Sequence, residues 1–289
     1  MPDRRLTTML VAALFALAIP SASAADIAWD KAIGASGIRL SAAQRTRAEG
    51  LLKAVGNTRG CEGTLAECLA RGDRTAQRHA GYVMRSVRRE RSDDAIRRGI
   101  ADRAASAFPR EIHKPDLASH PRQGPADAPV QLVEYACFQC PFCAHLAAVL
   151  EQRLKKEFGD KVAHYYKFFP VRSSSRGVES ATAGVAAHRQ GRFWQMYSLM
   201  FANRTKLADA DLLAYAGRAG LDLAKYEADI KDPAIMKQIE KDKLEGMRFG
   251  VDGTPTFLIN GKRYLGHNDL EELIDRIGEE IDIVEGRIK

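Results

Sequence analysis

Apolar residues in the second half of the chain fall into short runs that predict strands. Residues 130–135 combine β-branched and aromatic side chains, which is typical of a buried strand. Residues 162–169 have the same character and are followed directly by a proline. A third run, residues 256–259, leads into Asn260-Gly261, a strong two-residue hairpin signal, and residues 262–265 complete that hairpin. The pattern therefore predicts two separate strands and a hairpin.

Helical periodicity fills the segment between the second strand and the hairpin, from residue 175 to about residue 248. Four helices are expected there, over residues 178–188, 193–201, 209–219 and 233–248. The large apolar side chains of the second of these helices are expected to form the core of the block and not a cofactor site; they are Phe193, Trp194, Met196, Tyr197, Leu199 and Met200. Residues 145–150 predict a helix after the first strand, and residues 269–277 predict a closing helix.

The first third of the mature chain has an all-helical pattern. Ser41 is a suitable N-cap for a helix that ends near residue 54, and Asp73 for a helix that ends near residue 90. Ser92 caps a third helix, which Phe108-Pro109 ends. Prolines and glycines then gather in a linker. We expect a helical extension over residues 25–114, a linker over 115–129, and an α/β domain over 130–289 with a helical insertion at about 175–248.

Most of the net positive charge of the chain comes from this helical third. Residues 25–120 carry 18 Lys and Arg against 12 Asp and Glu, whereas residues 121–289 carry 24 of each kind. Six arginines recur at near-helical spacing: Arg85, Arg88, Arg89, Arg91, Arg97 and Arg98. We interpret them as a solvated helix face, with binding to an acidic partner or to anionic lipid as the alternative.

The first 24 residues have the pattern of a secretory signal peptide. Arg4 and Arg5 precede an apolar core over residues 6–19, and Ala22-Ser23-Ala24 supplies small residues for cleavage. The apolar core is too short to span a bilayer comfortably. We therefore expect export to an oxidising compartment, and for an exported chain we expect no nucleic-acid partner.

The motif Cys140-Pro141-Phe142-Cys143 lies where the first strand gives way to its helix. A thiolate at a helix N-terminus is stabilised by the unpaired N–H groups there, so its pKa falls. Pro141 suits the first helical turn, which needs no backbone donor from that residue. Cys140 is thus the expected nucleophile and Cys143, one turn further in, the resolving thiol. By itself, the same spacing also occurs in half of a zinc site.

A second marker lies far downstream, where Thr254-Pro255 precedes the apolar strand of the hairpin. With the C-x-x-C motif and the helical block before it, the chain from about residue 123 onward resembles the thioredoxin superfamily, specifically the DsbA-like thiol:disulfide oxidoreductases. The resemblance implies an α/β thioredoxin fold with an inserted helical domain, here preceded by an all-α N-terminal extension. It also implies that Pro255 follows a cis bond and lies against the C-x-x-C motif, where the backbone of Thr254 pairs with substrate. Glu134 matches the family's buried acid beneath the disulfide.

The resemblance implies a periplasmic enzyme that exchanges disulfides with exported proteins, as an oxidase or as an isomerase or reductase. Such chemistry needs no organic cofactor, but the cysteine pair must be recycled by a membrane redox partner. The N-terminal helices offer a route to an oligomer. Phe142 can neither donate a hydrogen bond nor carry charge, unlike the His that stands between the cysteines of the family's strongest oxidants. Together with Thr254, it favours a less oxidising disulfide.

Cys61 and Cys68 lie in the helical third and are expected to form a structural disulfide, because nearby cysteines of an exported chain usually pair. A second redox pair that relays electrons to the C-x-x-C motif is the alternative.

Cys137 departs from the family pattern and extends the motif to C-x-x-C-x-x-C. Cys137, Cys140 and Cys143 therefore allow a copper-handling protein as an alternative function, since soft thiolates bind Cu(I). We nevertheless expect no metal at this site. A non-catalytic binding module with merely structural cysteines is a further alternative, which inertness of Cys140 to alkylation would support.

Overall fold

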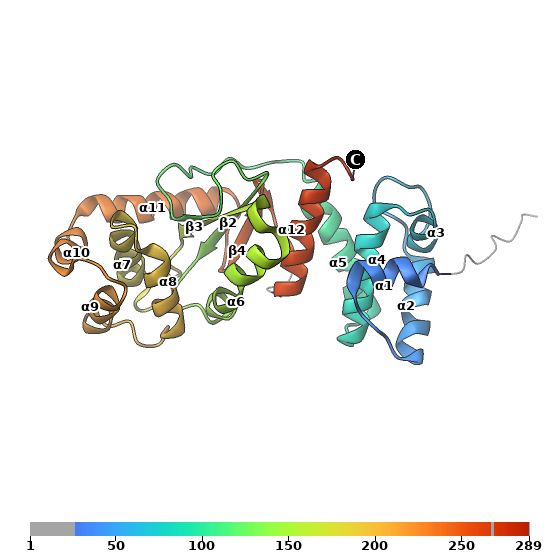
Figure 1. The fold of residues 1–289 in the computed structure, drawn as a ribbon, viewed down its shortest axis with the longest axis horizontal. Coiled ribbons are helices and arrows are strands. Elements are labelled where there is room, and N and C mark those ends of the chain that lie inside the picture. The colour runs from blue at the N-terminus through green and yellow to red at the C-terminus, as the bar shows by residue number, and fades with distance from the viewer. Residues whose placement is uncertain (1–26, 267–268, 289) are drawn as a thin grey trace, which may run out of the picture.

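The computed structural model describes residues 27–266 and 269–288 (Figure 1). The expected signal peptide, residues 1–24, lies outside the described residues. A five-stranded sheet with the order β1-β3-β2-β4-β5 occupies the centre of the second half of the chain. Its strands are β1 (Arg122–Gln123), β2 (Val130–Ala136), β3 (Val162–Phe168), β4 (Thr256–Ile259) and β5 (Lys262–Arg263).

The strands predicted from the sequence are all present, with one addition. β2 and β3 are parallel, β4 runs antiparallel to β2, and the hairpin turn at Asn260-Gly261 brings β5 alongside β4. The addition is β1, which pairs antiparallel with β3 at the edge of the sheet. β1 has two residues and no apolar run, so the hydrophobic pattern could not reveal it inside the segment expected to be a linker.

Helices cover both faces of the sheet (Figure 1). Leu132 of β2 belongs to a core that α6 (Pro141–Phe158) and α12 (Leu270–Val284) complete. Val133 and Tyr135 point to the opposite face, where the Tyr135 hydroxyl donates to Glu245 of α11 (Pro233–Arg248) at 2.9 Å. Alternate residues of β2 thus face different helical layers, as a strand with both faces buried requires.

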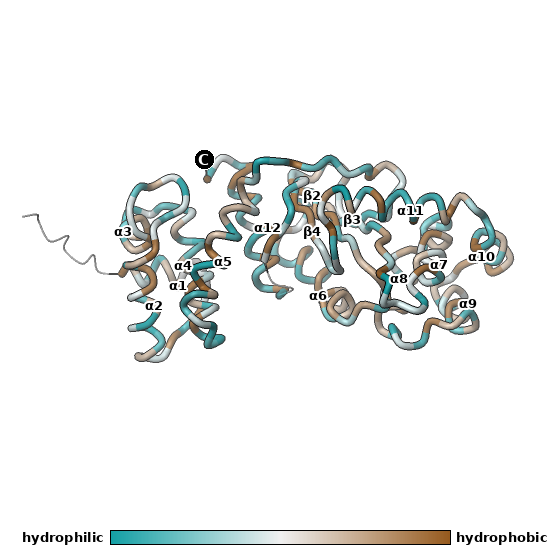
Figure 2. Tube along the Cα trace, turned by 180° about the vertical axis from the view of Figure 1, so that it is seen from behind, coloured by the Kyte–Doolittle hydropathy of each residue, from teal (hydrophilic) through white to brown (hydrophobic). Residues whose placement is uncertain are grey.

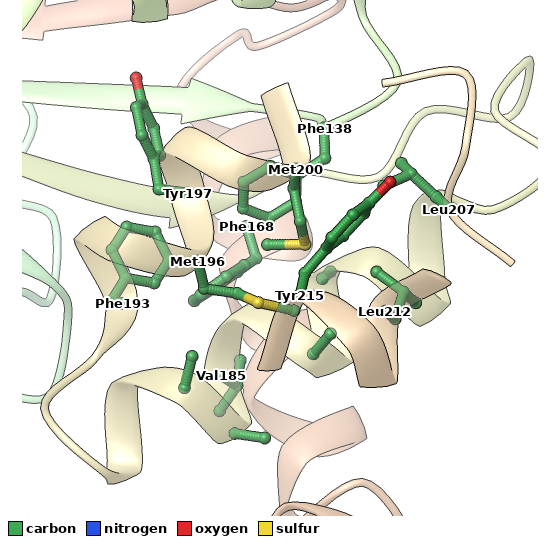
Figure 3. Close-up of a cluster of buried hydrophobic side chains, with 14 of the residues drawn as sticks. Phe138, Phe168, Val185, Phe193, Met196, Tyr197, Met200, Leu207, Leu212 and Tyr215 are labelled. Atoms are coloured by element: carbon green, nitrogen blue, oxygen red, sulfur yellow. The ribbon is translucent and has the colours of Figure 1, made fainter. Parts of the chain in front are cut away.

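The helical insertion lies between β3 and β4 and shares an apolar core with Phe138, after β2, and with Phe168 of β3 (Figure 3). It consists of α7 (Gly177–Arg189), α8 (Phe193–Ala202), α9 (Asp209–Arg218), α10 (Leu223–Asp229) and α11. Phe193, Met196, Tyr197 and Met200 are buried in this core, as expected. Trp194 and Leu199 are only partly buried, because they lie at its edge, where the Trp194 indole donates to the carbonyl of Arg122 at 3.1 Å. The seven-residue α10 was too short to be predicted from periodicity.

The N-terminal helices form a separate apolar core. They are α1 (Trp29–Ser36), α2 (Ala42–Ala54), α3 (Leu65–Ala70), α4 (Arg74–Arg88) and α5 (Asp93–Ala107). The side chains of Ser41, Asp73 and Ser92 accept hydrogen bonds from the first turns of α2, α4 and α5, which confirms the predicted N-caps. α1 and α3 were not predicted, since each has eight residues or fewer.

The arginines of the N-terminal helices meet the acidic face of α12, beside which α4 and α5 lie in both Figure 1 and Figure 2. Asp275, which is buried, is paired with Arg78 at 3.0 Å, with Arg103 at 2.9 Å and with Arg85. Burial alone would raise the pKa of Asp275, but the charges of these three arginines outweigh it and hold that pKa well below its ordinary value. A buried charge network therefore joins the two parts of the chain.

For Arg85 and Arg91, this network corrects the interpretation of the arginine-rich segment as a solvated face. Arg85 is buried against Asp275, Arg89 pairs with Asp269 at 2.9 Å, and Arg91 pairs with Glu272. The other four arginines are exposed, as expected: Arg88, Arg89, Arg97 and Arg98. The acidic groups that pair with Arg85, Arg89 and Arg91 lie in α12 or at its N-cap, in the same chain.

Replacement of Asp275 by Asn tests how much this charge network contributes to the stability of the protein. The amide cannot neutralise three guanidinium groups, so we expect Asp275→Asn to lower the free energy of unfolding by about 3–5 kcal/mol, as measured by denaturant titration. The matched control is Asp252→Asn, which removes an exposed carboxylate paired, among the described residues, only with Arg263 and is expected to cost no more than about 1 kcal/mol. Equal losses in the two variants would contradict this account of the junction.

Candidate active site

Cys140 occupies the N-cap position of α6, with Pro141 in the first turn. The backbone N–H of Cys143 points at the Cys140 sulfur, with 3.5 Å between N and Sγ. The strand β2 ends at Ala136, so the sheet carries the chain directly to this helix start. The cysteine therefore lies where the free N–H groups of α6 favour a negative charge.

The surroundings of Cys140 lower its pKa to about 5. The largest contribution is the hydrogen bond from the Cys143 side chain, and burial opposes it. The Thr254 side chain and the backbone N–H groups of Cys143 and Phe142 add further donors. Cys140 retains 8% of its exposed surface, while the neighbouring Phe142 is 60% exposed. The sulfur is thus a thiolate at neutral pH that remains in contact with solvent.

Cys143 has the opposite character. Its side chain has no exposed surface, and burial raises its pKa far above the ordinary thiol value. The hydrogen bond that it donates to Cys140 and the negative charge of Glu134 raise the pKa further. The two sulfurs of one motif are therefore strongly inequivalent: Cys140 is charged and keeps a small solvent contact, whereas Cys143 is neutral and fully enclosed.

Glu134 is completely buried on β2, behind the cysteines. Its Oε2 lies 3.0 Å from Nε2 of His164 on β3, and the Tyr197 hydroxyl of α8 donates to the same oxygen at 3.5 Å. The charge of Glu134 also contributes to the raised pKa values of Tyr166 and Tyr197, after burial. The carboxyl group thus connects electrostatically with the sulfur of Cys143 and with the polar groups of two other elements.

The loop before β4 lies against the cysteine pair. The Thr254–Pro255 peptide bond is cis, as the family resemblance implies. The carbonyl oxygen of Thr254 lies 3.1 Å from the Cys140 sulfur. The structure therefore brings together Glu134, Cys140, Cys143 and Thr254-Pro255, which are spread over more than a hundred residues of sequence.

Cys61 and Cys68 lie apart from this group, in the core region of the N-terminal helices. They form a disulfide with their Cα atoms 5.6 Å apart, as predicted. Cys137 is buried, and its thiol donates to the Ser174 hydroxyl at 3.2 Å. Within residues 27–266 and 269–288, no group of three or more Cys, His, Asp or Glu side chains is arranged to hold a metal ion.

Two residues that contact Glu134, His164 and Tyr197, were not predicted as part of the site. A signal for His164 was present, because it stands among the apolar and aromatic residues of a strand that is buried along its whole length. A buried histidine needs a polar partner, and the parallel register of β2 and β3 provides Glu134. Tyr197 carried no comparable signal, since it also suits an apolar helix face.

The part of the chain that contains these residues also matches a known protein family. A family model described as thioredoxin matches residues 117–278. The Na(+)/H(+) antiporter NhaA 1 of Mycolicibacterium gilvum is 33% identical over 155 residues, which are 53% of this chain and 25% of the antiporter. The NhaA antiporter of Herminiimonas arsenicoxydans is 34% identical over 147 residues, 51% of this chain and 23% of the antiporter. The chain spans about a quarter of the length of these relatives. In the described part of this chain, no helix combines the length and the apolar character that crossing a membrane requires.

Solved structures share the fold. A thioredoxin-like oxidoreductase from Silicibacter pomeroyi superimposes with a TM-score of 0.52 at 21% identity, over 57% of this chain and 94% of that one. BdbD from Bacillus subtilis gives 0.51 at 20% identity, over 59% and 97%. The alpha-DsbA1 protein of Wolbachia pipientis gives 0.52 at 19%, over 60% and 96%. The expected fold, an α/β thioredoxin fold with added helices, is thereby confirmed.

The pKa of Cys140 can be measured from the pH dependence of its alkylation. In the reduced protein we expect the rate of reaction with iodoacetamide to rise with a midpoint near 5. Because the Cys143 thiol is the main donor to the thiolate, Cys143→Ala should move the midpoint toward the ordinary thiol value near 9. Cys137→Ala is the matched control and should leave it in place. A midpoint near 9 in the unmodified protein would show that the donors around Cys140 do not stabilise its thiolate.

Proposed function

The chain belongs to the thioredoxin family, and from this premise we propose that it is a thiol:disulfide oxidoreductase whose redox centre is the Cys140–Cys143 pair. The observation that carries the proposal is the contrast between the two sulfurs. A thiolate that keeps a small solvent contact can exchange with an incoming sulfur, and a fully buried thiol beside it can complete the reaction without competing for substrate. The fold neighbour from Silicibacter pomeroyi, which is named a thioredoxin-like oxidoreductase, supports the same class of chemistry.

As an oxidant, the enzyme begins with the Cys140–Cys143 disulfide. A substrate thiolate attacks the Cys140 sulfur, the bond between the cysteines breaks, and its electron pair leaves on Cys143, which takes up a proton. A second substrate thiolate then attacks the substrate sulfur of the mixed disulfide. The substrate leaves with a disulfide, Cys140 leaves as a thiolate, and two electrons have passed to the enzyme.

In the isomerase or reductase direction, the Cys140 thiolate attacks a substrate disulfide and forms the mixed disulfide. Cys143 then loses its proton and attacks Cys140, which releases the substrate thiolate. Glu134 is the proposed proton acceptor, because its carboxyl group is buried next to the raised-pKa thiol. The low pKa of Cys140 makes it a good leaving group from the mixed disulfide in the oxidase direction, and keeps it as the attacking thiolate in the reductase direction.

Thr254 and Pro255 form the proposed substrate platform. The Thr254 carbonyl lies beside the Cys140 sulfur, so an extended peptide that reaches this sulfur also reaches the backbone of the loop. Backbone pairing of this kind is independent of the substrate's side chains and suits an enzyme with many protein substrates. The exposed Phe142 adds an apolar surface at the same place.

We propose that the enzyme works in the periplasm on exported proteins and is recycled by a membrane redox partner. The Cys61–Cys68 disulfide supports an oxidising compartment, because disulfides persist there. Its two sulfurs belong to the N-terminal helical core, so we assign it a structural and not a relay role. We also propose the organisation set out from the sequence: an N-terminal helical extension that offers an oligomer contact, a linker, and a thioredoxin domain with its helical insertion.

Cysteine variants test the assignment of the nucleophile. With Cys143→Ser, the mixed disulfide cannot be resolved from within the enzyme, so we expect substrate proteins to accumulate covalently on Cys140. With Cys140→Ser, exchange should be lost, because the remaining thiol is buried and protonated. Mass spectrometry of alkylated samples identifies the linked cysteine, and Cys137→Ser serves as the control with full activity. Substrates trapped on Cys143 in the Cys140→Ser variant would reverse the assignment.

The residue between the cysteines tests what sets the oxidising strength. We expect a reduction potential between about −150 and −250 mV for the natural sequence. Phe142→His places a donor, partly charged at neutral pH, near the Cys140 thiolate and should raise the potential by stabilising the reduced form. Phe142→Leu adds no donor and is the matched control. Equilibration with glutathione measures all three, and equal potentials for the His and Leu variants would show that another group sets the value.

A further inference from the structure

A cavity with a volume of about 600 Å³ lies in the helical insertion. Its lining comes from α7, α9, α10 and α11, which lie together at the end of the molecule opposite the N-terminal helices (Figure 1). Sites that bind small ligands or single side chains commonly have volumes of about 300–1,000 Å³ and a mostly apolar lining. The cavity is therefore large enough to hold a bulky side chain.

The lining of the cavity is largely apolar, and part of it faces solvent. Val178 of α7, Ile230 at the C-cap of α10 and Met236 of α11 are 40%, 37% and 38% exposed, and all three line the cavity. The lining also includes Tyr226 and Leu212 (Figure 3), which are buried. Residues far apart in the sequence thus bring exposed apolar surface to one place, which in a soluble domain marks a binding surface.

Charged side chains border this apolar lining. Glu179 and Asp209 both pair with the guanidinium group of Arg176, so one positive charge serves two carboxylates. Among the described residues, neither Glu227 nor Lys231 has an ion-pair partner. Three carboxylates therefore stand against two cations, and the excess of negative charge favours a ligand that carries a positive charge beside its apolar part.

The start of α7 connects the cavity with the loop that holds the cysteines. The backbone N–H of Arg176 donates at 2.7 Å to the side chain of Gln139, the residue before Cys140. Val178, two residues after Arg176, lines the cavity. Summed along these contacts, the path from Cys140 to Val178 is no longer than about 20 Å, which about six extended residues span. One extended segment can therefore reach both places.

We propose that the cavity binds a large apolar side chain of the substrate, flanked by Lys or Arg, in an unfolded segment whose cysteine reacts with Cys140. The apolar side chain covers Val178, Ile230 and Met236, and its basic neighbour pairs with Glu227. The proposal rests on the redox function proposed above and adds a substrate class to it. Folded proteins keep most large apolar side chains in their cores, so the cavity selects chains that have not yet folded.

The cavity and the Thr254-Pro255 platform divide the recognition of substrate between them. Pairing with the backbone at the platform is independent of side chains and gives no preference among substrates. Occupation of the cavity makes the encounter between the substrate sulfur and Cys140 intramolecular, so it raises the effective concentration of that sulfur. The cavity thus supplies a preference that the platform lacks.

The test measures how fast the reduced protein reacts with peptides that differ only in the residues expected at the cavity. Each peptide carries one cysteine in a disulfide with nitrothiobenzoate and, about six residues away on one side or the other, a Trp between two Lys. The Cys140 thiolate attacks the peptide sulfur, and the sulfur–sulfur bond breaks with its electron pair on the coloured nitrothiobenzoate thiolate, whose release is followed. In one of the two directions, we expect release on the order of tenfold faster than from peptides with Ser for Trp. Glu in place of the two Lys should also slow it.

Variants locate the preference on the surface. Ile230→Asp places a charge in the apolar lining and should abolish the advantage of the Trp peptide. Glu227→Lys should reverse the preference, so that Glu-flanked peptides react faster than Lys-flanked ones. Leu244→Asp is the matched control, because Leu244 is an exposed apolar residue of α11 that does not line the cavity, and it should behave like the unmodified protein. An unchanged preference in Ile230→Asp, or an equal loss in Leu244→Asp, would overturn the proposal.

Photo-cross-linking identifies the contact directly. With a benzophenone side chain in place of the Trp, the peptide should become attached to Ile230 or Met236, as located by mass spectrometry. Attachment at Phe142 alone would place the apolar side chain beside the cysteines and overturn the proposal. The symmetrical disulfide of nitrothiobenzoate, which has no peptide, should react equally with all variants. Failure of the unmodified protein to react with it at neutral pH would contradict the redox function itself, whereas a normal reaction without any preference among peptides would contradict the cavity alone.

Discussion

The N-terminus of helix α6 helps to lower the pKa of the Cys140 thiol, whereas the carboxyl group of Glu134 helps to raise the pKa of the Cys143 thiol. Backbone donors and the Cys143 thiol stabilise a thiolate on Cys140, and burial with a nearby negative charge keeps Cys143 protonated. Each effect depends on the other, since the proton that remains on Cys143 is the main donor to Cys140. The sheet is what makes the arrangement possible: β2 carries Glu134 and delivers the chain to α6, and the strand beside it, β4, begins at the Thr254-Pro255 loop.

Helix α12 ties this centre to the rest of the chain. One side of it supplies Leu273, Ile277 and Ile281 to the core shared with β2 and α6, and the other supplies Asp275 and its neighbouring carboxylates to the arginines of α4 and α5. Apolar burial fixes the first contact and charge pairing the second. Because buried pairs lose much stability when one partner is removed, the N-terminal helices are held by a specific pattern and not by general attraction.

The sequence allowed the elements and the redox motif to be predicted, because these depend on short-range signals. Ser41, Asp73 and Ser92 cap their helices as expected, and the positions of Cys140, Cys143 and Thr254-Pro255 follow from local spacing and from family resemblance. Contacts between distant segments could not be predicted from the sequence. Nothing within residues 85–98 indicates that Arg85 neutralises Asp275, 190 positions away. Likewise, the pairing of His164 with Glu134 depends on strand register, which hydrophobic patterns leave undetermined. Short elements such as α3 and α10 hold too few residues to display a period.

The central claim, that Cys140 and Cys143 are one redox couple, is tested most directly by a redox titration that follows all five cysteines separately. The protein is equilibrated across a series of glutathione buffers, quenched with an alkylating reagent, and digested, and the modified fraction of each cysteine is determined by mass spectrometry. We predict that Cys140 and Cys143 change state together with the slope of a two-electron couple, while Cys137 stays reduced and Cys61–Cys68 stays oxidised. Titration of Cys61 and Cys68 over that range, with Cys140 and Cys143 changing independently or not at all, would contradict the account.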